Sequence, residues 1–402
     1  MHKRSEEVLN KIILKKNEER RINKGHLWVF SNEIDKIEQS EEFRVQSGDT
    51  VEIFDSRKNF IGTGFYNPNS LIAVRIISRE KVHDLGLLFE KRLTDAFNFR
   101  KSMYPLRNSF RMVFSESDFL PGLIIDKYNN TFVLQVYSSG MEKNIDLINR
   151  ILIEKYSAEN IFSKNEEYFR KLEGLPLEDK IYFGSMNEEI INDGFIKYTI
   201  DFSSSHKTGF YFDQCDNREF AGKFTKGKTV LDCFCNLGGF GLHAAMNNAD
   251  MVTFVDSSKQ LIESVKTNYR LNQFTTKAEF VDSDVFDYLQ KCISQNKKYD
   301  VVIIDPPAFA KNKKALPAAI KGYEKLNKLA MQVVNENGFL FTSSCSFHLK
   351  KDQFIEIINS ASLKAGIKAQ IFHFNHASKD HPVLPSMEET VYLKFAGLRI
   401  SS

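Results

Sequence analysis

Residues 228–256, KTVLDCFCNLGGFGLHAAMNNADMVTFVD, decide the fold of this chain. The stretch predicts an apolar strand, a glycine-rich turn, a helix of small residues and a second strand that ends in Asp256. This order is half of a nucleotide-binding sheet with helices on both faces, and the ligand of such a sheet lies against the turn. Asp256 follows Asp232 at the distance where these sheets place an acid that accepts hydrogen bonds from two ribose hydroxyls. The ligand is therefore expected to contain an adenosine.

The turn itself favours a cationic ligand over a phosphate. Gly238, Gly239 and Gly241 do not follow the spacing of the dinucleotide fingerprint. A carboxylate at the end of the first strand, Asp232, would repel a phosphate but would suit an amine or a nearby sulfonium. S-adenosylmethionine fits both Asp256 and Asp232, because it joins an adenosine to a sulfonium and an amine.

The composition indicates a reduced intracellular protein of more than one domain. The 402 residues exceed one ordinary core, and 42% of them are hydrophobic. The 55 basic and 52 acidic side chains nearly balance, so net charge alone does not establish a nucleic-acid partner. The N-terminus has no apolar core of signal-peptide length, and no window approaches eighteen uncharged apolar residues, so we expect a cytoplasmic chain with no membrane partner.

Three domains are expected, and together they form an α/β fold. Residues 1–78 read as short strands separated by glycine turns, which predicts a small β-barrel; basic residues and aromatics there favour RNA binding. Residues 79–189 predict a connector helix and a middle α/β domain with one helix over residues 141–156. Residues 190–402 alternate strands and helices in the manner of a Rossmann-like domain, and its last strand is expected at TVYLKF, residues 390–395.

Two loops at the carboxyl ends of the predicted fourth and fifth strands carry the chemistry. Asp305 leaves the apolar run VVII and begins a loop that is stiffened by two prolines. Cys345 leaves the next strand, and open α/β sheets bind their ligands at this rim. Carbon 5 of a pyrimidine becomes nucleophilic once a thiolate adds at carbon 6, so Cys345 could be that nucleophile. Asp305 could hold the N3 and amino edge of cytosine and stabilise the charge that the addition generates.

The other cysteines do not indicate a metal site. Cys233 and Cys235 lie two residues apart, but no further Cys or His pair is placed to complete four ligands. We therefore expect these two thiols to pack in the core, and we expect no metal. The base that would remove the carbon 5 proton has no candidate in the sequence.

With these residues in view, the chain resembles the bacterial large-subunit ribosomal RNA cytosine-5 methyltransferases, which have an N-terminal PUA domain. The likeness covers nearly the full length and rests on GHLWVF from Gly25, LPGL from Leu120, KTGF from Lys207, DPPAF from Asp305, Ser344-Cys345-Ser346 and HPVL from His381. It implies a class I methyltransferase domain, S-adenosylmethionine as cofactor, large-subunit ribosomal RNA as partner, and Cys345 and Asp305 as catalytic residues; it leaves a homodimer open. The implied cofactor-binding residues are Lys207, Thr208, Phe210, Asp213, Arg218, Asp232, Phe234, Asn236, Gly238, Gly239, Asp256, Ser257, Asp284, Val285, Asp305 and Pro306.

Two other functions remain open at this point. The loop from Asp305 to Phe309 also resembles loops that hold adenine amino groups, so the enzyme could methylate an exocyclic base amine, which needs no thiolate. The chain also departs from the family at Cys215 and at Asn236-Leu237, beside the cofactor turn. A binding or assembly protein that keeps a vestigial pocket is the third hypothesis.

Overall fold

The structure is a computed structural model that describes residues 10–39, 44–203, 208–310 and 312–401. The chain divides into two compact units, and each is described by itself. The first comprises residues 1–189, 200–210 and 380–390, and the second comprises residues 190–199, 211–379 and 391–402.

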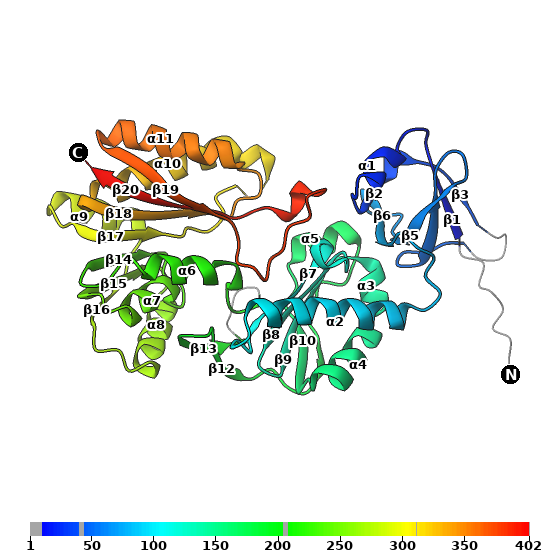
Figure 1. Ribbon diagram of the computed structural model, residues 1–402, viewed down its shortest axis with the longest axis horizontal. Helices are drawn as coiled ribbons and strands as arrows, with labels where there is room; N and C mark the ends of the chain where they lie inside the picture. Colours follow the sequence, from blue (N-terminus) through cyan, green and yellow to red (C-terminus); the bar gives the residue numbers. More distant parts are fainter. Residues whose placement is uncertain (1–9, 40–43, 204–207, 311, 402) are drawn as a thin grey trace. The chain divides into compact units, whose positions relative to one another are not determined.

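The N-terminal part of the first unit is a six-stranded sheet in the order β2-β6-β5-β4-β1-β3, drawn in blue in Figure 1. Its neighbours pair antiparallel except β1 and β4, which are parallel. Val29, Val51, Ile53 and Val74 are buried inside it, so the predicted small β domain is confirmed. Its elements are β1 (Asn10–Leu14), α1 (Glu19–Asn23), β2 (Trp28–Phe30), η1 (Ser31–Glu33), β3 (Ile34–Glu38), β4 (Thr50–Phe54), β5 (Phe60–Tyr66) and β6 (Ile72–Ser78).

The rest of the first unit is a five-stranded sheet in the order β11-β10-β9-β8-β7 with helices packed on it. The helix predicted over residues 141–156 is two helices, because the Asn144 side chain bonds the carbonyl of Gly140 at 2.8 Å and the chain breaks there. The elements are α2 (Leu85–Met103), β7 (Phe110–Phe114), η2 (Ser115–Asp118), β8 (Leu123–Tyr128), β9 (Thr131–Val136), α3 (Ser139–Lys143), α4 (Ile145–Tyr156), β10 (Asn160–Ser163), α5 (Glu167–Glu173) and β11 (Ile181–Phe183).

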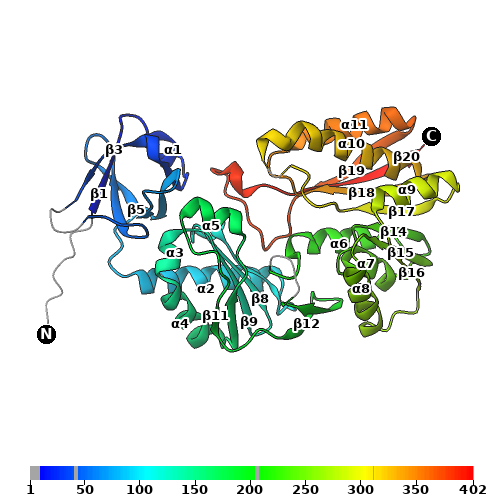
Figure 2. The ribbon, with the colours of Figure 1, turned by 180° about the vertical axis from the view of Figure 1, so that it is seen from behind.

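The second unit is a seven-stranded sheet in the order β16-β15-β14-β17-β18-β20-β19, with helices on both faces (Figures 1 and 2). The first five strands of this order are parallel, and β20 runs antiparallel to both neighbours. A hairpin, β12 (Glu188–Asn192) and β13 (Lys197–Asp201), leads toward it. The remaining elements are η3 (Phe212–Gln214), α6 (Cys215–Gly222), β14 (Thr229–Cys233), α7 (Gly239–Met246), β15 (Met251–Asp256), α8 (Lys259–Leu271), β16 (Lys277–Asp282), α9 (Val285–Ser294), β17 (Tyr299–Ile304), η4 (Lys313–Ala315), α10 (Leu316–Gln332), β18 (Val334–Ser344), α11 (Lys351–Ala365), β19 (Lys368–Asn375) and β20 (Lys394–Ser401). One further turn, η5 (Glu388–Thr390), belongs to the first unit.

The last strand lies four residues later than predicted. Residues 388–390 form a 3₁₀ turn, in which the Thr390 hydroxyl donates to the carbonyl of Met387 and accepts from the N–H of Leu384. A side chain that is committed to this local turn keeps its residue out of the sheet. β20 therefore begins at Lys394 and runs to Ser401 between β18 and β19.

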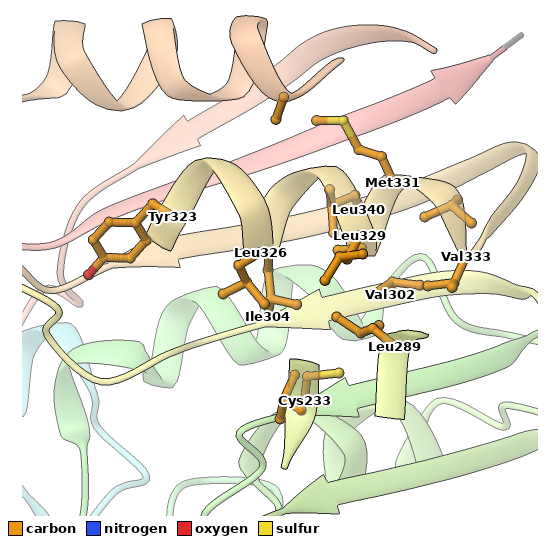
Figure 3. Packing of buried hydrophobic residues seen from close by; sticks show 14 of the residues in the cluster. Cys233, Leu289, Val302, Ile304, Tyr323, Leu326, Leu329, Met331, Val333 and Leu340 are labelled. Carbon is orange, nitrogen blue, oxygen red and sulfur yellow. The ribbon is translucent and has the colours of Figure 1, made fainter. Parts of the chain in front are cut away.

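The main core of the second unit lies between the sheet and helices α9, α10 and α11. Figure 3 shows Leu326 and Leu329 of α10 packed against Val302, Ile304 and Leu340 of the sheet. Residues 301–304 of β17 are all buried, as the uninterrupted apolar run predicts for a parallel strand covered on both faces. This burial holds the carboxyl ends of β14, β17 and β18 together at one rim.

Candidate active site

The turn between β14 and α7 is tightly wound. Phe234, Asn236 and Gly238 have positive φ angles of 59°, 50° and 86°. Such angles are uncommon outside glycine, and they cluster where a functional loop is held in one shape. The N–H of Cys235 donates to the carbonyl of Val255 at 3.1 Å, which ties the turn to β15. The turn is therefore a fixed surface against which a ligand can lie.

Asp232 is a buried acid, and only one of its two carboxylate oxygens accepts a hydrogen bond among the described residues. The residue is 1% exposed, and its Oδ2 accepts the N–H of Gly241 at 2.8 Å. Oδ1 is buried and has no hydrogen-bond partner among the residues that the structure describes. Burial raises the pKa of this carboxyl to about 7. A buried carboxylate oxygen without a donor would be stabilised by a cationic N–H group. The site therefore fits the amine of S-adenosylmethionine.

The first turn of α7 lies against Arg218 of α6. A Cβ atom on Gly239 would come within 2.4 Å of the Arg218 Nε, so the close approach requires glycine at this position. Arg218 is buried, which opposes its charge, but surrounding groups that include Asp305 raise its pKa above the ordinary value. The guanidinium therefore stays charged between the cofactor turn and the Asp305 loop.

The acids at the ends of the next two strands lie at the same rim. Asp256 accepts the N–H of Asn236 at 3.1 Å and the N–H of Ser258 at 3.0 Å, so it links β15 to the glycine turn. Asp284 is exposed and caps α9 by accepting the N–H of Asp287 at 3.1 Å. Between these groups, Ser257 is exposed, whereas the Val285 side chain packs in the core. Val285 can therefore reach a ligand only through its backbone.

The structure places Asp305 and Cys345 just after the ends of two neighbouring strands. They follow β17 and β18, which are parallel neighbours, and the Ser343 hydroxyl donates a hydrogen bond to Asp305. The Gln214 amide donates to the same Asp305 oxygen at 2.9 Å, and the Cys345 thiol lies 3.9 Å from the carbonyl of Pro306. Burial raises the pKa of Asp305 to about 6. A carboxyl that titrates near neutral pH and a thiol thus follow neighbouring strands at the same rim.

A second set of bonds locks the two loops to each other. The Tyr323 hydroxyl, labelled in Figure 3, lies 2.9 Å from the hydroxyl of Ser346, which also accepts the N–H of Ala310 at 3.2 Å. The ring of Phe309 lies 4.5 Å from that of Tyr323. Sequence reasoning missed Tyr323 and Gln214, because neither belongs to the two loops.

The remaining predicted site residues precede α6. Asp213 accepts a hydrogen bond from the Tyr392 hydroxyl at 2.6 Å, and its other oxygen is buried without a partner among the described residues. Thr208 and Phe210 belong to the first unit, where both are buried and the Phe210 N–H donates to the Tyr128 hydroxyl at 3.0 Å. Lys207 lies outside the described residues.

All five cysteines lie within the described residues, and they differ in exposure. Cys215, Cys233, Cys235 and Cys292 are buried, while Cys345 is partly exposed. Burial raises the pKa of the Cys233 and Cys235 thiols well above the ordinary value, so these thiols are inert packing groups. Within residues 10–39, 44–203, 208–310 and 312–401, no group of three or more His, Cys, Asp or Glu side chains could hold a metal ion. No helix in those ranges is long and apolar enough to cross a membrane.

Comparison with known proteins extends these observations. Residues 12–79 match the family described as PUA-like domain, and residues 210–354 match the family described as conserved hypothetical protein 95. The ribosomal RNA large subunit methyltransferase I of Tolumonas auensis is 37% identical over 391 residues, which cover 95% of this chain and 97% of the relative. The protein of the same name from Aliivibrio fischeri is 35% identical over 395 residues, which cover 97% and 99%.

Two solved structures share the whole fold. A methyltransferase candidate solved with SAH has a TM-score of 0.82 at 23% identity, and a candidate SAM-dependent methyltransferase from Streptococcus mutans has a TM-score of 0.80 at 22% identity. Each match covers 97% of this chain and 99% of the other. The predicted class I methyltransferase fold with a PUA-like N-terminal domain is thereby confirmed, and so is S-adenosylmethionine as the cofactor. With more than a third of its residues identical to those of the Tolumonas auensis protein over nearly the full length, the chain belongs to the ribosomal RNA large subunit methyltransferase I family.

Proposed function

We propose that this enzyme methylates carbon 5 of a cytosine in large-subunit ribosomal RNA, with Cys345 as the nucleophile. The observation that carries the proposal is the position of Cys345 and Asp305 at the ends of two paired parallel strands, where Ser343 donates to Asp305 and the Cys345 thiol lies near the carbonyl of Pro306. The relatives' name supplies the class of RNA. A thiol and a carboxyl in this arrangement suit a pyrimidine ring, whose carbon 6 takes the sulfur while its N3 edge takes the carboxyl.

Asp305 has the acidity that this role needs. With a pKa of about 6, the carboxyl can give a proton to N3 as the sulfur adds and can take it back afterwards. Ser343 and Gln214 fix one of its oxygens. The addition is therefore assisted where negative charge develops in the ring.

The cofactor would be held at the glycine turn, where it supplies an electrophilic methyl group. Asp232 would accept hydrogen bonds from its amine, because one oxygen of this buried carboxyl has no partner among the described residues. Asp256 and Asp284 lie at the ends of the next strands, where ribose and adenine contacts are expected. Gly238, Gly239, Phe234, Asn236, Ser257, Val285 and Pro306 would complete this surface.

The three predicted domains take distinct roles in this proposal. Residues 1–78 bind RNA through the PUA-like domain, residues 79–189 form the middle domain, and residues 190–402 carry out methyl transfer in the cytoplasm. A loss of RNA affinity with intact S-adenosylmethionine binding, after removal of the basic side chains Arg44, Arg57 and Lys58, would support the first assignment.

Replacing Cys345 with Ala tests the chemistry. The variant should lose methyl transfer to ribosomal RNA but bind SAH with unchanged affinity by calorimetry, because the thiol lies at the base side of the site. Cys292→Ala is the matched control, since it removes a thiol that is buried away from the rim.

Nucleoside mass spectrometry of the product separates this function from methylation of an exocyclic amine. The proposal predicts 5-methylcytidine. An N-methylated base, formed by a Cys345→Ala enzyme of full activity, would overturn it. Failure of the intact protein to bind SAH would instead favour a binding or assembly role.

A further inference from the structure

A thiol nucleophile works as its thiolate, and an ordinary cysteine is mostly protonated at neutral pH. The structure places a buried lysine beside Cys345. Lys394 begins β20 and is the cross-strand partner of Ser344, the residue before Cys345. Its Nζ donates to the carbonyl of Ser346, the residue after Cys345, at 2.7 Å. The backbone of Lys394 therefore pairs with the residue before the thiol, and its ammonium is held at the carbonyl of the residue after the thiol.

The surroundings of Lys394 are unusual for a lysine. The residue is 3% exposed, and lysine is almost never buried unless a partner compensates its charge. The same Nζ also donates to the carbonyl of Tyr392 at 2.7 Å. Burial lowers the pKa of Lys394 to about 8, while the charge of Cys345 acts to raise it. The two groups thus interact, and the neutral carbonyls alone do not balance the ammonium.

We propose that the buried ammonium of Lys394 stabilises the thiolate form of Cys345 and so prepares it to add to the base. The inference rests on the proposed function, since it concerns the nucleophile of that reaction. Lys394 is a positioning residue, because it acts through the sulfur and does not touch the base.

Other titratable groups near the thiol do not supply this charge. The carboxylate of Asp305 would oppose a thiolate, and burial raises the pKa of the Tyr323 hydroxyl, which keeps it neutral. His348 and Lys350 belong to the loop after Cys345, and Lys350 is exposed, so solvent screens its charge. Of these two lysines, Lys394 is buried and Lys350 is exposed. The charges that raise the pKa of the buried Arg218 come from Cys215, Tyr198, Asp305 and Asp193.

Lys394 neither gives nor takes a proton in the reaction step. The electron pair of the thiolate forms the bond between sulfur and carbon 6. The π bond between carbons 5 and 6 breaks, and its electron pair moves into the ring as N3 takes the proton of Asp305; carbon 5 then gives this enamine pair to the methyl group. After carbon 5 has been methylated and has lost its proton, that bond breaks and the pair returns to sulfur. Lys394 keeps its proton throughout, so its effect is electrostatic at both ends of the cycle.

Alkylation of Cys345 measures this effect without using methyl transfer. Iodoacetamide reacts with the thiolate, and the rate at the peptide that contains Cys345 is followed by mass spectrometry against pH. The Lys394→Met variant should move the midpoint of this profile up by about one pH unit, which slows alkylation about tenfold below the midpoint. Lys350→Met is the matched control and should leave the midpoint unchanged.

A second variant separates the loss of the charge from a loss of folding. Lys394→Met leaves two buried carbonyls without a donor, whereas Lys394→Gln keeps N–H donors and removes only the charge. SAH affinity by calorimetry reports whether each variant is folded. A folded Lys394→Gln protein whose midpoint equals that of the native enzyme would overturn the inference.

The outcome separates this inference from the proposed function. A shifted midpoint in an enzyme that makes an N-methylated base would leave the Lys394–Cys345 pair standing and remove the cytosine-5 assignment. An unshifted midpoint in an enzyme that makes 5-methylcytidine through Cys345 would remove the role of Lys394 alone.

Discussion

Cofactor binding should depend on pH through Asp232. Burial raises the pKa of this carboxyl from 3.8 to about 7, and the carboxylate form is the one that accepts from an amine. If SAH binds only this form, about a tenth of the protein is competent at pH 6 and about nine tenths at pH 8. The dissociation constant at pH 6 should therefore be about ten times that at pH 8.

Calorimetry of SAH binding across this range is the assay, with two controls. 5′-Methylthioadenosine lacks the amino-acid portion, so its affinity should not follow the titration of Asp232. The Asp232→Asn variant should bind SAH weakly and without the pH dependence. An SAH affinity in the native enzyme that stays constant from pH 6 to pH 8 would refute the assignment of Asp232 to the amine.

The ionised Asp232 carboxyl should lower the free energy of unfolding of the ligand-free protein. Its folded pKa lies above its unfolded value, so the native state binds the extra proton and stability falls as pH rises from about 4 to about 7. The full displacement corresponds to roughly 4 kcal/mol. Asp232→Asn removes this ionisation, and it should raise the melting temperature at pH 8 while it weakens SAH binding.

Two further substitutions test the packing that holds each unit together. Gly241→Ala would place a Cβ atom 2.2 Å from the Phe254 ring, which is buried and stacked on Phe280, so we expect a loss of about 1–3 kcal/mol in denaturant unfolding; unchanged stability would contradict this packing. Asp118→Ala would leave the guanidinium of Arg100, which is 0% exposed, without its carboxylate, and should cost about 3–5 kcal/mol, whereas Asp95→Ala, which breaks the exposed pair with Lys91, should change the melting temperature little. Equal effects of the two aspartate variants would contradict the buried role of Arg100.

The strands and the rim were predictable because their signals are local. An apolar run such as VVII in β17 admits few structures other than a buried parallel strand, and parallel strands bring their carboxyl ends to one edge. Asp305 and Cys345 follow two such strands, so their proximity could be expected before any coordinates. The sharp bend of the glycine turn was likewise indicated by Gly238.

Features that depend on distant partners were not predictable. Lys394 reads as a surface residue in sequence, and only the register of β20 against β18 buries it beside Cys345. The start of that strand was placed four residues too early, because the Thr390 side chain closes a local turn. Asn144 breaks a helix through its own side chain in the same manner, in a segment whose apolar period continues across the break.

The most direct test of the account traps the bond between Cys345 and the base. Ribosomal RNA that carries 5-fluorocytidine cannot lose a proton at carbon 5, so methyl transfer to it should stop with the sulfur attached at carbon 6. The account predicts a denaturation-resistant protein–RNA complex whose linked peptide contains Cys345, and no such complex with Cys345→Ala. A native enzyme that methylates ordinary ribosomal RNA but forms no adduct with the fluorinated RNA, or an adduct at another residue, would contradict it.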